Sequence, residues 1–238
     1  MNKRIINKTM TCSLLAGALF AGNALAAPIN QSFDSFGTLA AATFGGTGIP
    51  NDAVAISVTS IGGGVTLGLT AHQRYFNPAL TNDGAGTFFA NPGVDTHAPS
   101  SATDPYATWN VGFYIGGTGQ DAYTYKLFYD FDRGSNTDEN DHGQFSFPGS
   151  PGTIQDSWNL GMNFLGTSMP GLIDPGTGTF DPNNVGEYSF ALVAYDLQGA
   201  EVDRSAIVVQ VGQVPEPGTL ALLGLGLAGL AGMRRRKA

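Results

Sequence analysis

Residues 187–212, EYSFALVAYDLQGAEVDRSAIVVQVG, decide the fold of this 238-residue chain. The runs 187–196 and 202–212 are rich in β-branched and aromatic residues, and the five residues LQGAE at 197–201 join them. Two such runs separated by a short connection that contains glycine predict a β-hairpin. An antiparallel β-structure is therefore expected at this end of the domain.

Upstream of the hairpin, apolar and polar residues alternate in short segments, which is typical of strands that are buried on one face. We predict strands at 52–59, 64–71, 107–115, 121–131 and 157–164. Aromatic residues at alternate positions, as in 121–131, more often form core than a surface that binds ligands. The segments 77–106 and 166–186 are rich in Gly, Pro, Asn, Asp and Thr, so we expect long loops there.

These segments predict an all-β fold, a single antiparallel β-sandwich domain that spans residues 27–213. The sequence YSFALVAYD at 188–196 resembles the penultimate strand of immunoglobulin-like sandwiches in bacterial surface proteins. This resemblance implies that an immunoglobulin-like arrangement is one form that the sandwich could take. An N-terminal signal helix and a C-terminal hydrophobic helix are expected to flank the domain.

Residues 1–26 have the pattern of a signal peptide. A basic start, KRIINK at 3–8, precedes a mostly apolar stretch at 10–22, and Ala24 and Ala26 supply the small-x-small pattern of a cleavage site. We therefore expect cleavage after Ala26 and a secreted mature chain that begins near Ala27.

The chain after the signal is strongly acidic and has no cysteine. Residues 27–213 hold four Lys and Arg against eighteen Asp and Glu, a net charge of −14. A domain with this charge repels phosphate backbones, which argues against nucleic acid as a partner. The only cysteine, Cys12, lies in the signal, so the mature protein can form no disulfide or thiolate metal site.

The end of the chain consists of a motif, an apolar stretch and a basic terminus. VPEPGT at 214–219 precedes fourteen uncharged residues at 220–233, and Arg234, Arg235, Arg236 and Lys237 follow. Fourteen helical residues reach about 21 Å, short of a hydrocarbon core about 30 Å thick, so the stretch would hold a membrane only marginally. The positive-inside rule would keep the basic terminus in the cytoplasm and the acidic domain outside.

This order of blocks over 214–238 resembles the PEP-CTERM sorting signal of Gram-negative bacteria. The resemblance implies that an exosortase, a membrane-embedded processing enzyme, recognises Pro215, Glu216 and Pro217 and removes the tail. It implies transient anchoring in the inner membrane and then delivery to the cell surface or the extracellular matrix. Such proteins are typical of bacteria that make exopolysaccharide and biofilm.

An acidic segment follows the predicted strand at 121–131. Calcium takes about six to eight oxygen ligands, and a loop with oxygen side chains at every second residue can supply several of them. The candidate ligands are Asp130, Asp132, Asn136, Asp138 and Asp141. The spacing resembles an EF-hand loop, but Gly134 and Ser135 stand where that loop has a ligand and a glycine. Two interpretations of this segment remain, an irregular calcium site and a solvated acidic turn.

The sequence as a whole predicts an exported protein that is not an enzyme and that has a structural or interaction role in exopolysaccharide or biofilm. The alternatives are a carbohydrate-binding module and a calcium-binding adhesion protein. A module that binds sugars would use exposed rings, for which the candidates are Tyr75, Phe76, Phe88, Phe89 and Tyr106. A secreted hydrolase is a further hypothesis, which needs two carboxylates about 5 to 10 Å apart in a pocket.

Overall fold

The predicted hairpin forms the centre of one of two β-sheets. β11 (Gly186–Tyr195) pairs antiparallel with β12 (Glu201–Val211), from Gly186 opposite Val211 to Tyr195 opposite Glu201. The computed structural model describes residues 27–59, 64–76, 78–101, 103–149 and 151–212. The predicted signal helix, with its cleavage residues Ala24 and Ala26, and the C-terminal helix lie outside these residues.

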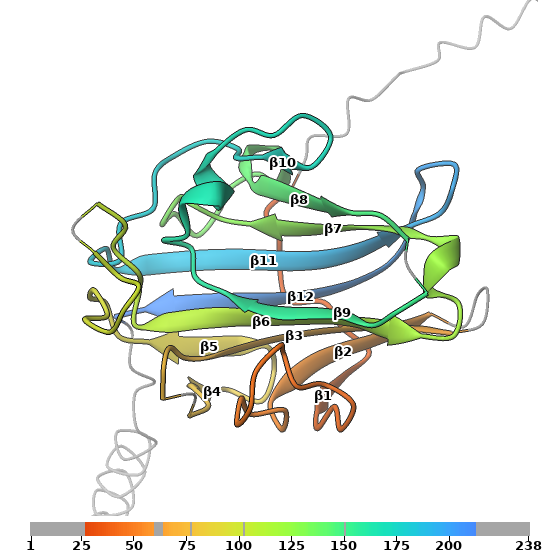
Figure 1. Cartoon of the computed structure of the whole chain (residues 1–238), viewed down its shortest axis with the longest axis horizontal. Coiled ribbons are helices and arrows are strands. Elements are labelled where there is room, and N and C mark those ends of the chain that lie inside the picture. The colour runs from red at the N-terminus through yellow and green to blue at the C-terminus, as the bar shows by residue number, and fades with distance from the viewer. Residues whose placement is uncertain (1–26, 60–63, 77, 102, 150, 213–238) are drawn as a thin grey trace, which may run out of the picture.

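The strands are arranged in a five-stranded and a seven-stranded sheet (Figure 1). The first has the order β1-β2-β3-β6-β9, with β1 at Ser35–Gly37, β2 at Val54–Thr59, β3 at Val65–Gln73, β6 at Trp109–Gly117 and β9 at Ile154–Trp158. The second has the order β10-β8-β7-β11-β12-β5-β4. Its remaining strands are β10 (Ile173–Asp174), β8 (Gly143–Phe147), β7 (Thr124–Tyr129), β5 (Thr87–Ala90) and β4 (Thr81–Asn82).

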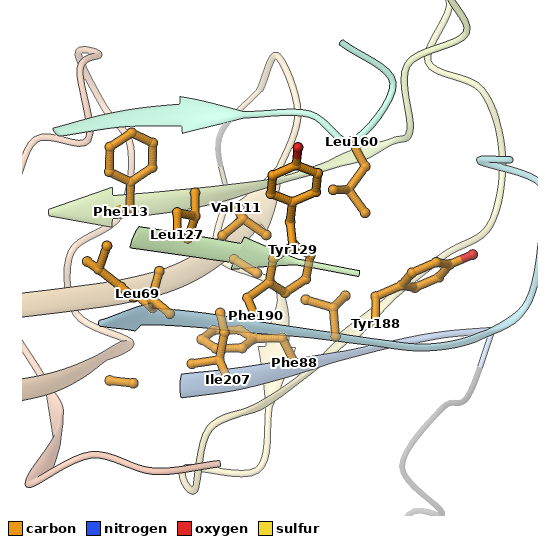
Figure 2. Close-up of a cluster of buried hydrophobic side chains, with 14 of the residues drawn as sticks. Leu69, Phe88, Val111, Phe113, Leu127, Tyr129, Leu160, Tyr188, Phe190 and Ile207 are labelled. Atoms are coloured by element: carbon orange, nitrogen blue, oxygen red, sulfur yellow. The ribbon is translucent and has the colours of Figure 1, made fainter. Parts of the chain in front are cut away.

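The core lies between the two sheets because the inward-facing residues of both are apolar. Every second residue of β6, β7 and β11 is buried in one cluster, as the alternation in the sequence predicts. Figure 2 shows Leu69, Val111 and Phe113 of the five-stranded sheet against Leu127, Tyr129, Phe190 and Ile207 of the other. Two sheets that share one apolar core confirm an all-β, two-layer fold.

The structure corrects the sequence prediction in three places. The seven-stranded sheet is mixed rather than antiparallel, because β5 pairs parallel with β12, Val208 lying opposite Thr87. β4 and β5 lie inside the segment 77–106, which was predicted to be a loop. The predicted strand 157–164 ends at Trp158 and gives way to the 3-10 helix η4 (Asn163–Gly166).

The connections gather at one end of the sheets, which we call the loop end. β6 and β11 begin and β12 ends on the left side of Figure 1. β3 and β9 pair antiparallel with β6, and β7 pairs antiparallel with β11, so these three strands also end there. The loop end therefore carries the segments that follow β3, β5, β7 and β9 and those that precede β6 and β11.

Candidate functional site

An exposed group of rings at the loop end, Tyr75, Phe76 and His97, forms the candidate site and is called the aromatic cluster below. Tyr75 is 58% exposed and Phe76 is 69% exposed, although large apolar side chains are usually covered. The ring centroids of Tyr75 and His97 lie 4.1 Å apart at an interplanar angle of 16°. The Phe76 ring is nearly perpendicular to both of these rings, with its centroid 5.2 Å from that of Tyr75 and 5.0 Å from that of His97.

The backbone turns sharply to present these rings. Tyr75 has a φ of 70°, in the left-handed region that residues with a side chain rarely adopt. The turn is closed on both sides, because the N–H of Phe76 donates to the carbonyl of Arg74 and the N–H of Gln73 donates to that of Pro78. Strained backbone of this kind costs on the order of 1 kcal/mol and is found preferentially at functional sites.

A buried ion pair holds the cluster from beneath. Arg74 donates from Nη1 to Oδ2 of Asp95 at 2.5 Å, and both side chains are 8% exposed. The same guanidinium also donates to the carbonyls of His97 at 3.1 Å and Ala98 at 3.2 Å. Asp95 in turn accepts from Nδ1 of His97 at 2.6 Å and from the backbone N–H of His97 at 2.8 Å. The orientation of the His97 ring is therefore fixed by Arg74 through Asp95.

The charge of Asp95 is stabilised despite its burial. Burial by itself raises the pKa of this carboxyl, but the hydrogen bonds from His97 and from Arg74 outweigh that effect and lower the pKa below its usual value. Asp95 is thus a carboxylate at neutral pH, and its charge is neutralised by Arg74. The ion pair of Arg74 and Asp95 therefore adds no net charge beneath the aromatic cluster.

The structure separates the five rings proposed for sugar binding. Tyr75 and Phe76 are exposed, whereas Phe88 is fully buried on β5 and Phe89 is half-buried. Tyr106 is half-buried, with the guanidinium carbon of Arg74 4.8 Å above its ring. Phe88 is therefore excluded as a contact residue. His97, which the sequence analysis did not select, completes the group.

A groove of about 650 Å³ also opens at the loop end. Its lining includes four large apolar residues, Phe131, Leu160, Met162 and Phe180, and four polar ones, Thr103, Asn163, Thr167 and Thr179. The segment that contains Thr103 and Pro105 lines this groove and continues into Tyr106. The carbonyl of Tyr106 accepts a hydrogen bond from the backbone N–H of Asp95. The volume is within the range of small-molecule sites, about 300 to 1,000 Å³.

The candidate calcium ligands make contacts within their own segment. Oδ1 of Asp132 accepts from the N–H of Gly134, and Oδ1 of Asp138 accepts from the N–H of Asn140 at the start of η3 (Glu139–Asp141). Asn136 and Asp141 are exposed, and Asp130 is buried. Among the residues described by the structure, no group of three or more His, Cys, Asp or Glu is placed to hold a metal ion. The geometry is that of a turn fixed by its own side chains.

Asp130 instead belongs to a buried polar network with His142 and Ser189. Nε2 of His142 lies 2.8 Å from Oγ of Ser189, and this Oγ lies 3.4 Å from Oδ2 of Asp130. Burial raises the pKa of Asp130 to about 6, although the nearby His142 acts to lower it. No sequence pattern indicates this network, because Asp130 and His142 are 59 and 47 residues from Ser189.

The network does not have the geometry of a hydrolytic triad. In a triad the carboxylate binds the imidazole nitrogen opposite the one that faces the serine. Here Nδ1 of His142 contacts the carbonyl of Asp138 at 3.0 Å, and Asp130 lies on the Nε2 side together with Ser189. Ser189 is also only 5% exposed, so substrate cannot reach its hydroxyl in this structure.

Comparison with known proteins identifies the end of the chain. Residues 213–237 match the PEP-CTERM protein-sorting motif, which confirms the resemblance seen in the sequence. The chain therefore carries the signal for exosortase-dependent export to the cell surface or the extracellular space. No curated protein matches the chain as a whole. The matched residues, with Pro215, Glu216 and Pro217 and the basic residues Arg234, Arg235 and Arg236, lie outside the described part of the structure.

The helices of the described part do not include a membrane span. None of them is both long and apolar enough to cross a bilayer. The apolar stretch 220–233 does not belong to that part.

Proposed function

We propose that this protein is a noncatalytic component of the bacterial cell surface or of its polysaccharide matrix, where the β-domain makes contacts and the tail serves delivery. The observation that carries this proposal is the sorting motif at 213–237, which begins two residues after β12 ends at Val211. Almost no linker separates the folded domain from the processing signal. Removal of the tail would leave a domain that is complete to its last strand.

The composition of the domain supports an extracellular interaction role. Its net charge of −14 favours solubility outside the cell, and it has no thiol that an oxidising environment could attack. The Ser189, His142 and Asp130 network is enclosed and lacks triad geometry, which supports a noncatalytic assignment. The polysaccharide matrix as the destination rests on the class of bacteria in which this sorting system is typical.

The membrane has a transient part in this proposal. The apolar stretch 220–233 would insert into the inner membrane with the arginines on the cytoplasmic side, and exosortase would then cut near Pro215, Glu216 and Pro217. An apolar stretch of about 21 Å is suited to temporary retention rather than to a permanent anchor.

Mass spectrometry of the protein from its producing cells tests this proposal. Cells would be separated into inner membrane, surface and medium, and the terminal peptides of the protein identified in each fraction. We expect the surface and medium forms to begin at Ala27 and to end near 215–217. Recovery of intact Arg234 to Arg236 from the surface form would contradict tail removal, and a protein confined to the cytoplasm would overturn the function.

A carbohydrate-binding module is the second candidate, because one observation favours it. Tyr75 and Phe76 are large apolar rings with more than half of their surface in solvent. Exposed apolar side chains that lie together in one patch are typical of binding surfaces.

A further inference from the structure

We propose that the aromatic cluster of Tyr75, Phe76 and His97 binds the pyranose rings of a neutral polysaccharide. This inference rests on the proposed extracellular function and assigns its contact site. The cluster presents flat apolar surface on an otherwise acidic domain, and the ligand class follows from its size, its charge and its support.

The size of the cluster fits a sugar better than a protein. A stable protein interface buries about 800 Å² on each partner. An aromatic side chain has at most about 250 Å² to bury, and Tyr75 and Phe76 are 58% and 69% exposed, so together they offer only roughly 300 Å². A pyranose has about the dimensions of one aromatic ring, with C–H groups on its faces and hydroxyls around its edge. The negative face of an aromatic ring attracts such C–H groups.

The charge of the domain selects a neutral polymer. The excess of fourteen negative charges over 27–213 would repel a polyuronate or a sulfated chain. The one cation beneath the cluster, Arg74, is buried and already paired with Asp95 and two carbonyls, so it is not available to an anionic sugar. An uncharged glycan meets the rings without an electrostatic penalty.

The support of the cluster gives it the rigidity that a binding surface needs. Tyr75 is stacked on His97, and His97 is held by Asp95, which is held by Arg74. Phe76 lies at the side of the stack, and Tyr75 and Phe76 both keep more than half of their surface for contact. Because the rings are ordered before binding, little side-chain entropy is lost when a sugar stacks on them.

Affinity electrophoresis of the processed protein tests the inference. Native gels would contain hydroxyethylcellulose as a neutral glucan, alginate as an anionic polyuronate, or the neutral polysaccharide of the producing cells. We expect retardation in at least one neutral gel and none in alginate. The variant Tyr75→Ala with Phe76→Ala should lower the apparent affinity about tenfold or more, whereas Tyr75→Phe should keep it.

The matched control is Leu197→Ala, because Leu197 is 76% exposed but lies in the β11–β12 turn, away from the loop end. This variant should bind as the wild type does, and the thermal midpoints of all variants should agree. Unchanged retardation of the double variant, retardation in alginate alone, or no retardation in any neutral gel would overturn the inference. If the wild type attaches to cells stripped of polysaccharide and the double variant does not, the cluster binds a protein partner instead.

These outcomes are separable from those of the proposed function. A protein that is exported and processed but does not bind neutral glycans refutes only the site. A protein that is never exported refutes the function, whatever its purified form binds.

Discussion

Oδ2 of Asp130 lies 3.7 Å from Nε2 of His142, and both side chains are at most 2% exposed. The hydroxyl of Ser189 lies between them, 2.8 Å from the imidazole and 3.4 Å from the carboxylate. Nδ1 of His142 faces the carbonyl of Asp138, which can only accept, so Nδ1 carries a proton. Nε2 is therefore the atom of His142 that faces Ser189 and Asp130.

Burial favours the protonated form of Asp130. The protonated carboxyl can donate to Ser189, whose hydroxyl then donates to Nε2 of His142.

The raised pKa of Asp130 predicts an effect of pH on stability. Its pKa is about 6 in the folded state against an ordinary value of 3.8, so between these pH values the Asp130 carboxyl holds a proton in the folded protein that it releases in the unfolded chain. This group therefore lowers the free energy of unfolding as the pH rises from about 4 to about 6. Asp130→Asn should remove that contribution, which urea unfolding across this pH range would measure. The same slope in variant and wild type would show that Asp130 is not its source.

Loss of the bridging hydroxyl should be costly. Ser189→Ala leaves Asp130 and His142 without their shared partner, and we expect a loss of about 1 to 3 kcal/mol in the free energy of unfolding. Ser205→Ala is the matched control, because the Ser205 hydroxyl is also buried but donates to a single carbonyl, that of Ala55. The control should lose the same amount at every pH, whereas the loss in Ser189→Ala should vary between pH 4 and 7.

Removal of Arg74 should destabilise the loop end and weaken the aromatic cluster together. Arg74→Ala leaves Asp95 as an unpaired buried carboxylate, and breaking such a pair costs about 3 kcal/mol or more. Arg133→Ala is a suitable control, because Arg133 is exposed and its guanidinium donates to the Asn184 side chain over a long distance, 3.5 Å. Chemical denaturation would measure stability and polysaccharide retardation would measure binding. Full binding by a folded Arg74→Ala protein would show that the support is not needed.

The sequence predicts the central strands because their alternation is long and regular. In β7 and β11 the inward positions are held by Tyr125, Leu127, Tyr188 and Phe190, and the core uses all of them. β5 was missed because it has only four residues, TFFA at 87–90, between segments rich in Gly, Asn and Pro. Its parallel pairing with β12 joins residues more than 100 positions apart, which no local pattern indicates.

The candidate site was predicted only in part for the same reason. Tyr75 and Phe76 could be selected as rings in a polar context, but their exposure differs from that of Phe88 only because β5 turns Phe88 into the core. His97 joins Tyr75 across 22 positions through a contact that depends on the fold. The sorting motif, by contrast, was identified from the sequence over 214–238, close to the match at 213–237, because its signal lies in contiguous residues.

The Pro-Glu-Pro sequence should be required for processing. Glu216→Ala alters the motif at 215–217 and should leave protein that keeps its tail in the membrane fraction. Thr219→Ser, just outside the three residues, should be processed as the wild type is. Detection of peptides that contain Arg234 to Arg236 distinguishes the two results. A Glu216→Ala protein that reaches the medium without its tail would show that another residue directs the cut.

The first residues of the expected mature chain cover the outer face of the seven-stranded sheet. The carbonyl of Ala27 accepts from the N–H of Glu139, and Ser32 exchanges both backbone hydrogen bonds with Ala206 of β12. Ile29 between them is 4% exposed and packs with Phe128, Ala191, Val193 and Ala206. Docking thus starts at the residue next to the predicted cleavage site.

Ile29→Ala should therefore destabilise the domain although it lies only two residues from the expected N-terminus. Truncation of a buried Ile costs about 2 to 5 kcal/mol in the free energy of unfolding. Ile29 is buried, and its segment also contacts η3, which directly precedes His142 in the chain. Val58→Ala serves as the control, because Val58 is 52% exposed and should change stability by no more than about 0.5 kcal/mol. Equal stability of both variants in urea would mean that the N-terminal segment is not held to the sheet in solution. A loss confined to Ile29→Ala would mean that the segment left by signal cleavage is an integral part of the fold.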